Sequence, residues 1–577
     1  MNTVRVIINE KERFVPENST ILEACRTMDV WIPTLCYHPD LKPRSNCKIC
    51  SVEVEGMDEL VESCSTFVQE GMTIRTHSER IQKKRESILA EILKNHPNDC
   101  LTCMKGSGDC ELQDLCYIMG ITREEHPFEN QIVEAYIDCS SDAILRDMNK
   151  CILCERCIQV CEEIQGIGVY HLVEDGNKKW ITTKDNKPLS ETNCINCGQC
   201  VKVCPVGALH EKSAIHEAYH ALLDPDKHVV VQVAPAIKNT LGEEFGLVPG
   251  TDVTGKVVAS LRSLGASKVF NTDFSADVTI MEEGTEFLHR LEEGKNLPLL
   301  TSCSPGWIKY VEHNFPELLS NVSSCKSPQQ MFGALVKSYY AEKNAIDPQK
   351  IVSISIMPCT AKKFEAKRVE MEVNGIQDVD IVLTTRELAK LIKLQKIPFL
   401  QLNDESFDEF LGIGTGAARI FASSGGVMEA ALRTVSHILT NGEMDTLDFY
   451  SVRGLDGTKE ASLEIAGKNL KVAVVNGTLH AKKLLEKVLS GEATYHFIEV
   501  MGCPGGCLGG GGAPIPDCLE TREKRKEGLY ASDAANPLRR SHENPEVQLL
   551  YQDYLSAPGS HLAHKLLHTH YTDRSFI

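Results

Sequence analysis

The residues with the clearest chemical meaning are eight cysteines in two runs, CILCERCIQVC (151–161) and CINCGQCVKVC (194–204). Both runs have the spacing C-x2-C-x2-C-x3-C. Three thiols spaced in this way in one loop suit the corners of a [4Fe–4S] cubane, whereas structural zinc usually joins two distant pairs. In this spacing the fourth cysteine of each run serves the other cluster. The predicted ligand sets are Cys151, Cys154, Cys157 and Cys204 for one cluster, and Cys194, Cys197, Cys200 and Cys161 for the other.

A second group, Cys36, Cys47, Cys50 and Cys64, has a close C-x2-C pair with one thiol upstream and one downstream. This arrangement is typical of a plant-type [2Fe–2S] site, although ten residues separate Cys36 from Cys47 where that spacing has four. Alternating apolar residues near the N-terminus predict strand, turn, strand and helix before it. We therefore expect a [2Fe–2S] domain here.

A third group combines one histidine with three thiols: His96, Cys100, Cys103 and Cys110. A lone histidine is more often a satisfied surface or core residue than a metal ligand. Here, however, three thiols leave a [4Fe–4S] cluster one ligand short, so we expect His96 to complete it. The sequence therefore predicts one [2Fe–2S] and three accessory [4Fe–4S] clusters, a row that carries single electrons to a buried site.

The distribution of cysteine divides the chain, since 18 of its 24 cysteines lie in the first 204 of 577 residues. We expect a [2Fe–2S] ferredoxin-like domain at 1–80, a helical His/Cys3 domain at 81–140, a two-cluster ferredoxin domain at 141–210 and a catalytic domain at 211–577. Beyond residue 228, apolar strands alternate with helices, which is typical of parallel sheets covered by helices. The predicted fold class is an α/β catalytic body of two lobes with largely parallel sheets, preceded by α+β ferredoxin-like domains.

Three of the remaining cysteines directly follow apolar strand-like runs: Cys303, Cys359 and Cys503. Ligand sites in parallel α/β sheets lie beyond the carboxyl ends of the strands, so these thiols are active-site candidates. We expect the unassigned thiols to be buried structural residues; they are Cys25, Cys116, Cys139, Cys325 and Cys518.

The net charge of −19 argues against nucleic-acid binding, which needs a basic face. No apolar run approaches the length of a membrane span, and the first residues lack the basic and apolar regions of a secretory signal. Clustered thiols in a long chain indicate metal binding or redox chemistry in a reducing compartment. We therefore expect a cytoplasmic protein without a membrane anchor.

Three C-terminal motifs occur in order: TSCSPGW (301–307), MPCTAKKFE (357–365) and MGCPGGCLGGGG (501–512). Together with the cluster motifs they resemble the [FeFe]-hydrogenases over essentially the whole chain, and most closely the clostridial type with four accessory clusters. The resemblance implies the reversible reaction 2H⁺ + 2e⁻ ⇌ H2. It also implies an H-cluster, which is a [4Fe–4S] cubane joined through a cysteine sulfur to a diiron unit with CO, cyanide and a bridging dithiolate.

By the same resemblance, Cys359, Cys503 and Cys507 hold the cubane, and Cys507 bridges to the diiron unit. Lys362 is implied to supply a cation to the cyanide ligands. The residues implied to line the diiron pocket are Ala234, Pro235, Gln329, Met357, Phe421 and Met501. The family usually has glycine after the pocket phenylalanine, whereas this chain has Ala422.

Protons also need a route to such a site. Glu283, Glu286 and Arg290 lie at i, i+3 and i+7, on one face of a predicted helix whose charge alone would indicate a solvated surface. They match the family's proton relay, as do Ser323 and Cys303. Carboxylates with a hydroxyl between them exchange protons readily, so these residue types suit the role.

One motif departs from the family at a metal ligand. The usual TSCCPGW has a relay cysteine followed by a cubane ligand, so Cys303 matches the relay and Ser304 stands at the ligand position. Three outcomes follow: the Ser304 oxygen ligates iron, Cys303 becomes the ligand and gives up its relay role, or the cubane is incomplete. Thiolates suit these clusters better than hydroxyls, so the second outcome, with Cys303 as the ligand, deserves a test. Cys325 is a further thiol that could take either role.

The implied partners are ferredoxin or a similar electron carrier, H2, protons and the maturation enzymes that build the diiron unit. Alternatively, the chain is the hydrogen-activating subunit of an NAD(P)-linked or electron-bifurcating hydrogenase with flavin- and NAD-binding subunits. The chain itself has no predicted nucleotide site, since its Gly-x-Gly-x-Gly segment at 412–416 follows an acidic stretch. A redox sensor without turnover is a third alternative, but it predicts loss of the relay residues, which are present. An NADH-dehydrogenase subunit matches only the first 210 residues.

Overall fold

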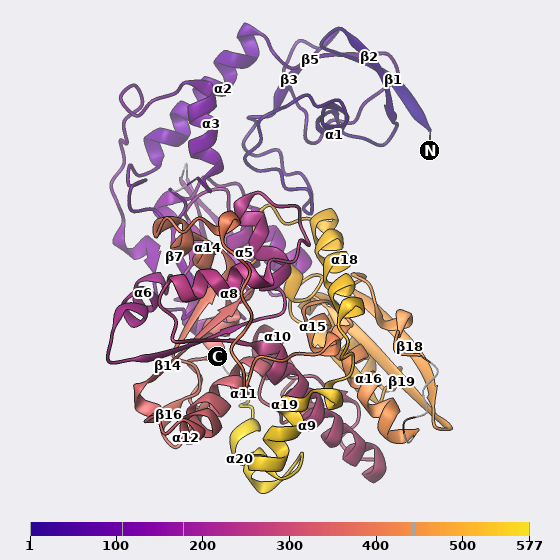
Figure 1. Ribbon diagram of the computed structural model, residues 1–577. Coiled ribbons are helices and arrows are strands. Elements are labelled where there is room, and N and C mark those ends of the chain that lie inside the picture. Colours follow the sequence, from indigo (N-terminus) through magenta and orange to yellow (C-terminus); the bar gives the residue numbers. More distant parts are fainter. Residues whose placement is uncertain (1, 107, 177, 441, 443–445, 576–577) are drawn as a thin grey trace.

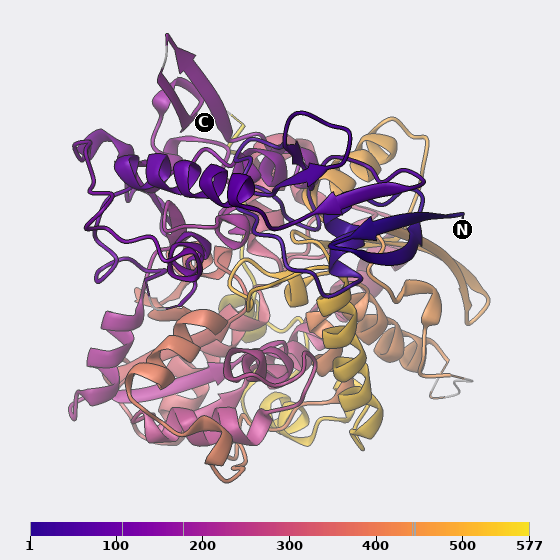
Figure 2. The same ribbon diagram turned by 90° about the horizontal axis from the view of Figure 1, so that it is seen from above.

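The computed structural model describes every residue except 1, 107, 177, 441, 443–445 and 576–577. The N-terminal segment, indigo to violet in Figure 1, lies above a larger body formed by the rest of the chain. Seen from above in Figure 2, this segment lies over one half of the body and leaves the other half uncovered. In the part of the chain that the structure describes, no helix is long and apolar enough to cross a membrane.

The N-terminal residues form a five-stranded sheet in the order β2-β1-β5-β3-β4. Its elements are β1 (Thr3–Ile8), β2 (Lys11–Pro16), α1 (Ile21–Arg26), β3 (Ser51–Val54), β4 (Val61–Glu62) and β5 (Met72–Arg75). The predicted order of strand, turn, strand and helix is confirmed. Helix α1 begins with a capping box, because the Thr20 hydroxyl accepts the backbone N–H of Glu23 and the Glu23 carboxylate accepts that of Thr20.

Two helices follow, α2 (Glu79–Asn95) and α3 (Glu111–Met119). The expectation of a helical segment over 81–140 is therefore only partly right, since residues 97–106 and 120–133 contain no helix. The first of these loops folds tightly on itself. A Cβ at Gly106 would lie 1.9 Å from the carbonyl oxygen of Cys100, so only glycine fits there.

Residues 137–211 pack short elements around the two cysteine runs. They form a three-stranded sheet, β10-β7-β6, and the hairpin β8-β9. The elements are β6 (Ile137–Asp138), β7 (Ile144–Asp147), α4 (Arg156–Gln159), β8 (Tyr170–Asp175), β9 (Lys178–Thr183), α5 (Gln199–Val203) and β10 (Leu209–Glu211). Each cysteine run contributes one short helix, and the two helices, α4 and α5, pack on each other.

The body contains two four-stranded sheets, one in each lobe. The first, β12-β11-β14-β17, is entirely parallel. Its strands are β11 (His228–Val233), β12 (Lys268–Asn271), β14 (Ile351–Met357) and β17 (Ile381–Thr384). The helices around it include α6 (Ile215–Leu223), α8 (Thr254–Ser263), α11 (Pro328–Leu335), α13 (Ala361–Glu365) and α14 (Thr385–Leu394). Buried valine, isoleucine and leucine dominate this core, as expected of a sheet covered on both faces.

The second sheet, β13-β20-β19-β18, is parallel except for the antiparallel hairpin β18-β19. Its strands are β13 (Leu299–Leu300), β18 (Thr458–Ile465), β19 (Lys468–Asn476) and β20 (Phe497–Met501), with helices α10 (Pro305–Asn314), α16 (Gly426–Leu439) and α17 (Thr478–Leu489). Helix α9 (Thr272–Glu293) packs against both α11 and α16 and so joins the two lobes. The predicted α/β body of two lobes with largely parallel sheets is confirmed.

The C-terminal residues wrap the body as α18 (Leu519–Ala535), α19 (Pro545–Leu550) and α20 (His561–Leu567), yellow in Figure 1. Buried ion pairs fix α18, among them Arg433 with Asp533 at 2.8 Å. The expectation of buried structural thiols holds for Cys25, Cys116 and Cys325, which are buried. It is wrong for Cys139, which is exposed, and for Cys518, which is partly exposed, because both lie in surface segments outside the cores.

Candidate active site

A cavity lies where strand ends from both sheets meet. Cys303 follows β13, Cys359 follows β14 and Cys507 lies in the loop after β20. The predicted site residues in the cavity wall are Ala234, Pro235, Cys303, Gln329, Met357, Cys359, Lys362, Phe421 and Cys507. Segments more than 250 residues apart therefore meet at the position that the parallel-sheet rule indicates.

The three thiols implied to hold a cubane lie together. Burial raises the pKa of the Cys359 thiol, and the charges of neighbouring Cys503 and Cys507 raise it further. The glycines of CPGGCLGGGG let this loop approach other backbone closely: a Cβ at Gly510 would lie 2.2 Å from the carbonyl oxygen of Pro358. Gly506 has a positive φ of 81°, where glycine is favoured.

Ser304 and Cys303 have different surroundings. The Ser304 hydroxyl oxygen accepts the backbone N–H of Gly502 at 3.0 Å, so this side chain lies against the residue that precedes Cys503. Cys303 instead forms part of the cavity wall. Cys325 lies outside the cavity wall, with its sulfur 3.9 Å from the carboxylate of Glu286.

Lys362 is fixed at the cavity edge by two acceptors. Its ammonium group donates to the carbonyl oxygen of Cys303 at 3.1 Å and to Glu365 Oε2 at 2.9 Å. The same carboxylate oxygen also accepts from Ser327 Oγ at 2.9 Å and Gln329 Nε2 at 3.0 Å. Glu365 is 3% exposed and organises these groups at the cavity, although no sequence motif assigned a role to this residue. Its position three residues after Lys362 on a short helix was the available signal.

Apart from Thr272, the rest of the wall is apolar. Pro235, Met357 and Phe421 line the cavity, and Ala422, where the family usually has glycine, packs against Ala236 and Leu508. Met501 does not form part of the wall and instead lies in the core that also contains Phe421. An apolar wall excludes water and strengthens the electrostatic effect of the few polar groups that remain.

The predicted relay residues form a path from the cavity outward along α9. Glu283 is 2% exposed, and burial, together with the charge of Glu286, raises its pKa to about 8 against the opposing effect of a hydrogen bond with Ser323. Its Oε1 has no partner among the described residues. Burial is the largest cause that raises the pKa of Cys303, and the negative charge of Glu283 is the second, so the two side chains are neighbours.

The outer half of this path is hydrogen-bonded throughout. The Ser323 hydroxyl donates to Glu286 Oε2 at 3.1 Å, and the guanidinium of Arg290 donates to Glu286 Oε1 at 2.5 Å. The side chains of Glu286 and Arg290 are 15% and 14% exposed, which places them nearer to solvent than Glu283. The structure thus brings together all five residues, although charge alone indicated an exposed helix.

The four cysteines of the predicted [2Fe–2S] site also lie together. Cys47 Sγ is 3.3 Å from Cys36 Sγ, and a hydrogen bond from Cys64 is the main cause that lowers the pKa of Cys50 to about 7. This clustering fits two irons held by four thiolates.

His96 has the environment of a metal ligand. Its imidazole is 7% exposed, and Nδ1 has no hydrogen-bond partner among the described residues. Burial, with the charge of Arg123, lowers the pKa of His96 to about 4, so the ring is neutral, as ligation requires. A buried nitrogen without a partner needs an explanation, and a bound iron supplies one.

The two cysteine runs exchange their fourth thiols. Cys151, Cys154, Cys157 and Cys204 line one small cavity. In the other set, burial raises the pKa of both Cys161 and Cys200, and the charge of Cys194 raises both further, so these three thiols lie close together. This placement supports the crossed ligand sets.

The second run abuts the active-site loop. A Cβ at Gly511 would lie 2.2 Å from the carbonyl oxygen of Cys197, and the amide of Gln199 donates to the carbonyl of Gly509 at 2.9 Å. Burial is the largest cause that raises the pKa of Cys197, and the charge of Cys503 is the second. Cys197 and Cys503, predicted ligands of two different clusters, are therefore neighbours.

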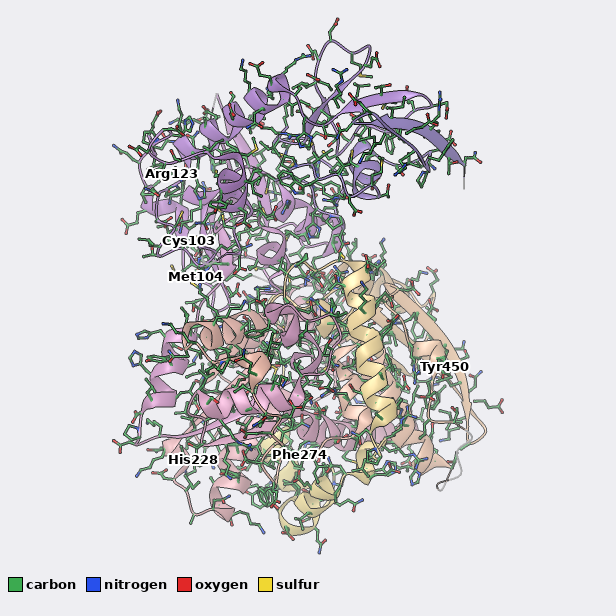
Figure 3. The ribbon with its side chains drawn as sticks, turned by 45° about the horizontal axis from the view of Figure 1, so that its top comes forward. Cys103, Met104, Arg123, His228, Phe274 and Tyr450 are labelled. Atoms are coloured by element: carbon green, nitrogen blue, oxygen red, sulfur yellow. The ribbon has the colours of Figure 1, made fainter. Side chains whose placement is uncertain are left out.

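The His/Cys3 region contacts the body as well. Figure 3 shows Cys103 and Met104 where the upper part meets the body. Lys390 of α14 donates to the carbonyl oxygen of Met104 at 3.0 Å. The region predicted to bind a cluster through His96 thus contacts α14 of the body directly.

Comparison with known families covers most of the chain. Residues 227–511 match the iron only hydrogenase large subunit, C-terminal domain, and residues 519–574 match the iron hydrogenase small subunit. The N-terminal part matches a 2Fe-2S iron–sulfur cluster binding domain (1–79), the NADH-ubiquinone oxidoreductase-G iron–sulfur binding region (85–125) and the ferredoxin-like domain of NADH-quinone oxidoreductase subunit 3 (141–210).

Individual proteins agree with this result. The chain is 49% identical over 587 residues to the NADP-reducing hydrogenase subunit HndD of Solidesulfovibrio fructosivorans, with 100% of both chains covered. It is 41% identical over 572 residues to iron hydrogenase 1 of Clostridium pasteurianum, covering 98% of this chain and 99% of the relative. A variant of apo [FeFe]-hydrogenase HydA1 from Chlamydomonas reinhardtii matches with a TM-score of 0.57 and 42% identity, covering 63% of this chain and 99% of that chain. The resemblance is confirmed, and the chain belongs to the iron-only, or [FeFe], hydrogenases.

Proposed function

We propose that this hydrogenase interconverts protons and H2 at an H-cluster held in the cavity between the two sheets. The observation that carries the proposal is the convergence of thiols, a buried lysine and a relay on one apolar cavity. Cys359, Cys503 and Cys507 would hold the cubane, because thiolates are the ligands that iron–sulfur clusters prefer. The cluster, when bound, supplies the two-electron chemistry of hydrogen.

The chain's own residues set the conditions at this cavity. Lys362 holds a positive charge at the edge, where the Glu365 carboxylate and the Cys303 carbonyl fix its position. A cation there stabilises anionic ligands such as cyanide. Pro235, Met357 and Phe421 exclude water, which keeps competing reactions away from the site.

Cys303, Glu283, Ser323 and Glu286 would move protons in that order, with Arg290 beside Glu286. Because the pKa of Glu283 is about 8, this carboxyl carries a proton near neutral pH and can release it to a neighbour. Ser323 passes protons between the two carboxyls, and Arg290 holds Glu286 in place at the outer end. Ser304 would remain at the fourth cubane position, since its bond to Gly502 holds it beside Cys503.

Electrons would reach the cavity through one [2Fe–2S] and three [4Fe–4S] clusters held by the ligand sets given above. The contact between Cys197 and Gly511 supports the second cysteine run as the last stage before the cubane. The family matches at 1–79, 85–125, 141–210 and 227–511 fall within the proposed domains at 1–80, 81–140, 141–210 and 211–577.

The chain would exchange electrons with partner subunits that bind flavin and a nicotinamide nucleotide. The observation that favours this arrangement over a ferredoxin partner is the level of identity: 49% to a relative named as a subunit of an NADP-reducing hydrogenase, against 41% to iron hydrogenase 1, with both matches covering nearly the whole chain. The glycine segment at 412–415 is a loop without strand or helix, and a Cβ at Gly414 would lie 2.2 Å from the Asp273 side chain. This segment is therefore packed against protein.

Anaerobic purification after co-expression with the maturation enzymes tests the first proposal. We expect infrared bands of CO and cyanide, and H2 evolution from reduced methyl viologen. Absence of both signals in a protein with its full iron content would refute it.

Size-exclusion chromatography and flavin analysis of the protein purified from its natural source test the second proposal. A flavin-free monomer that reduces ferredoxin but not NADP⁺ would refute the subunit arrangement.

A further inference from the structure

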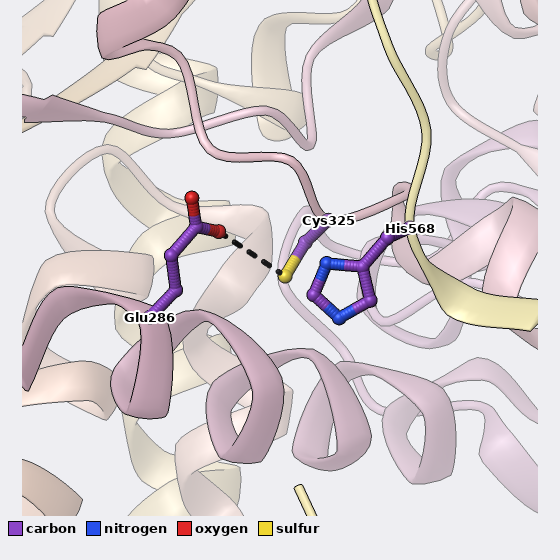
Figure 4. A group of neighbouring side chains, drawn as sticks. All are labelled: Glu286, Cys325 and His568. Atoms are coloured by element: carbon purple, nitrogen blue, oxygen red, sulfur yellow. Dashed lines mark hydrogen bonds between the residues drawn. The ribbon is translucent and has the colours of Figure 1, made fainter. Parts of the chain in front are cut away.

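Three side chains of types that bind metals lie close together beside the proposed proton relay. Glu286 lies on α9, Cys325 precedes α11, and His568 directly follows α20 (Figure 4). One ligating atom of each lies within 4.8 Å of the other two. Cys325 is fully buried at 0% exposure, and its sulfur is 3.9 Å from Glu286 Oε2. Thiol, imidazole and carboxylate are the three side-chain groups that bind zinc in proteins.

A second carboxylate orients the histidine. Glu282 Oε2 lies 3.0 Å from His568 Nε2, and Glu282 is itself held by the Tyr551 hydroxyl at 2.6 Å and the backbone N–H of Gly559 at 2.8 Å. A carboxylate on one ring nitrogen favours the proton there and leaves the other nitrogen free to bind a metal. This carboxylate–histidine arrangement is typical of zinc sites.

His568 Nδ1 and Glu286 Oε2 can both accept the hydroxyl hydrogen of Ser324. The Ser324 hydroxyl lies 2.8 Å from His568 Nδ1 and 3.1 Å from Glu286 Oε2. One hydroxyl hydrogen cannot satisfy both acceptors, so one of them lacks a donor from this group. A cation between the two acceptors would satisfy both at once.

We propose that Glu286, Cys325 and His568 bind one Zn²⁺ ion and that the bound zinc blocks the proton relay. Zinc–ligand bonds of about 2.0–2.3 Å place tetrahedral ligands roughly 3.3–3.8 Å apart. The separation of 3.9 Å between Cys325 and Glu286 is already close to that range. Binding converts the thiol to a thiolate and releases its proton to solvent, and a water or the Ser324 hydroxyl fills the fourth position.

The block follows from the atom that zinc would use. Glu286 Oε2 is the acceptor of the Ser323 hydroxyl, at 3.1 Å, so a metal on this oxygen interrupts the outer half of the path. This inhibitory effect rests on the proposed relay role of Glu286, whereas the binding of zinc does not.

The test uses the anaerobic holoenzyme in a background that lacks a competing surface site. His216 and His220 on α6 are exposed, with their Nε2 atoms 3.0 Å apart, and such a pair can also bind zinc. All proteins therefore carry His216→Ala and His220→Ala. Bound zinc is measured by mass spectrometry after gel filtration, and H2 evolution is expressed relative to each protein's own rate without zinc.

We expect the parent to bind one zinc and to lose at least nine-tenths of its rate, with recovery on addition of a chelator. Cys325→Ser, which is nearly isosteric, and His568→Gln should lose both the bound zinc and the inhibition. Glu282→Gln, which removes the orienting charge, should weaken binding by about 10–100-fold. Mg²⁺, a hard cation that prefers oxygen ligands, should have no effect.

Each contrary result has a separate meaning. Zinc binding and inhibition that persist in Cys325→Ser and His568→Gln would overturn the site. Loss of iron from the clusters on addition of zinc, seen as bleached visible absorption, would place zinc at cluster thiolates and would also overturn it. Site-dependent binding without inhibition would overturn the block and count against the relay role of Glu286, while the infrared bands would still report the hydrogenase site.

Discussion

Replacing Glu283 with glutamine keeps the shape of a buried side chain but removes the proton that it exchanges between Cys303 and Ser323. We expect the rate of H2 evolution to fall by about 10²–10⁴-fold, the usual contribution of one positioned acid or base. The unpartnered Oε1 and the 2% exposure of Glu283 leave little room for water to replace the missing proton carrier.

The same variant should be more stable than the wild type in alkaline solution. Burial is the main cause that raises the pKa of Glu283 from 4.5 to about 8, so the folded protein holds this proton more tightly than the unfolded chain. Below about pH 4.5 the carboxyl is protonated in both states and causes no penalty; the penalty grows as pH rises and is complete above about pH 8. A shift of this size lowers the free energy of unfolding by roughly 4–5 kcal/mol once the carboxyl is ionised. A glutamine side chain has no ionised form, so the variant avoids this loss.

Two assays separate these effects. H2 evolution from reduced methyl viologen, followed by gas chromatography, reports the relay, and thermal unfolding at pH 6 and pH 9 reports the linkage. Glu217→Gln, at an exposed position on α6, is the matched control and should change neither. A Glu283→Gln enzyme with more than half of the wild-type rate would refute the relay role. A difference in Tm from the wild type that is the same at both pH values would refute a buried proton on Glu283.

Further substitutions test the other parts of the site. Cys303→Ala should abolish H2 evolution with its infrared bands retained, and a fully active variant would contradict both roles considered for this thiol. Ser304→Cys should keep or raise the rate, because it restores a thiolate at the fourth cubane position, and a fall in rate with normal iron content would count against that position. His96→Ala should lose about four irons per chain by elemental analysis, since one [4Fe–4S] cluster loses a ligand. Gly511→Ala should slow electron entry from external donors more than hydrogen–deuterium exchange at the active site, because its Cβ would meet the Cys197 carbonyl at 2.2 Å; equal losses in both assays would refute a role in electron entry.

Cysteine spacing predicted the cluster-bearing part well because ligand geometry acts over a few residues. C-x2-C-x2-C-x3-C sets how a loop must wrap a cubane, and the crossed placement of Cys161 and Cys204 follows from the same geometry. In the body, the apolar strands indicate the sheet edge, so the sequence alone predicts that Cys303 and Cys359 lie at the site, and both form part of the cavity wall.

What the sequence did not predict depends on long-range packing. The segment 81–140 has helical periodicity in α2, but its cysteine loop is shaped by tight turns such as the one at Gly106 and not by periodicity. Glu365 has no motif of its own, and its importance appears only when Ser327, Gln329 and Lys362 converge on one of its oxygens. Local patterns carry no information on such convergence.

Ser304 shows how far packing can decide between chemical alternatives. A Cβ at Gly502 would lie 3.1 Å from the Ser304 hydroxyl oxygen, so the start of α10 and the loop before Cys503 are already in close contact. Turning Cys303 into this place would require moving its backbone, whose carbonyl accepts from Lys362 at 3.1 Å, and would remove its thiol from the cavity wall. For the hydroxyl of Ser304 to bind iron, by contrast, only its bond to the Gly502 N–H must be shared or exchanged. The local geometry therefore favours an oxygen at the fourth cubane position over a displaced thiolate, even though the preference of iron for sulfur points the other way.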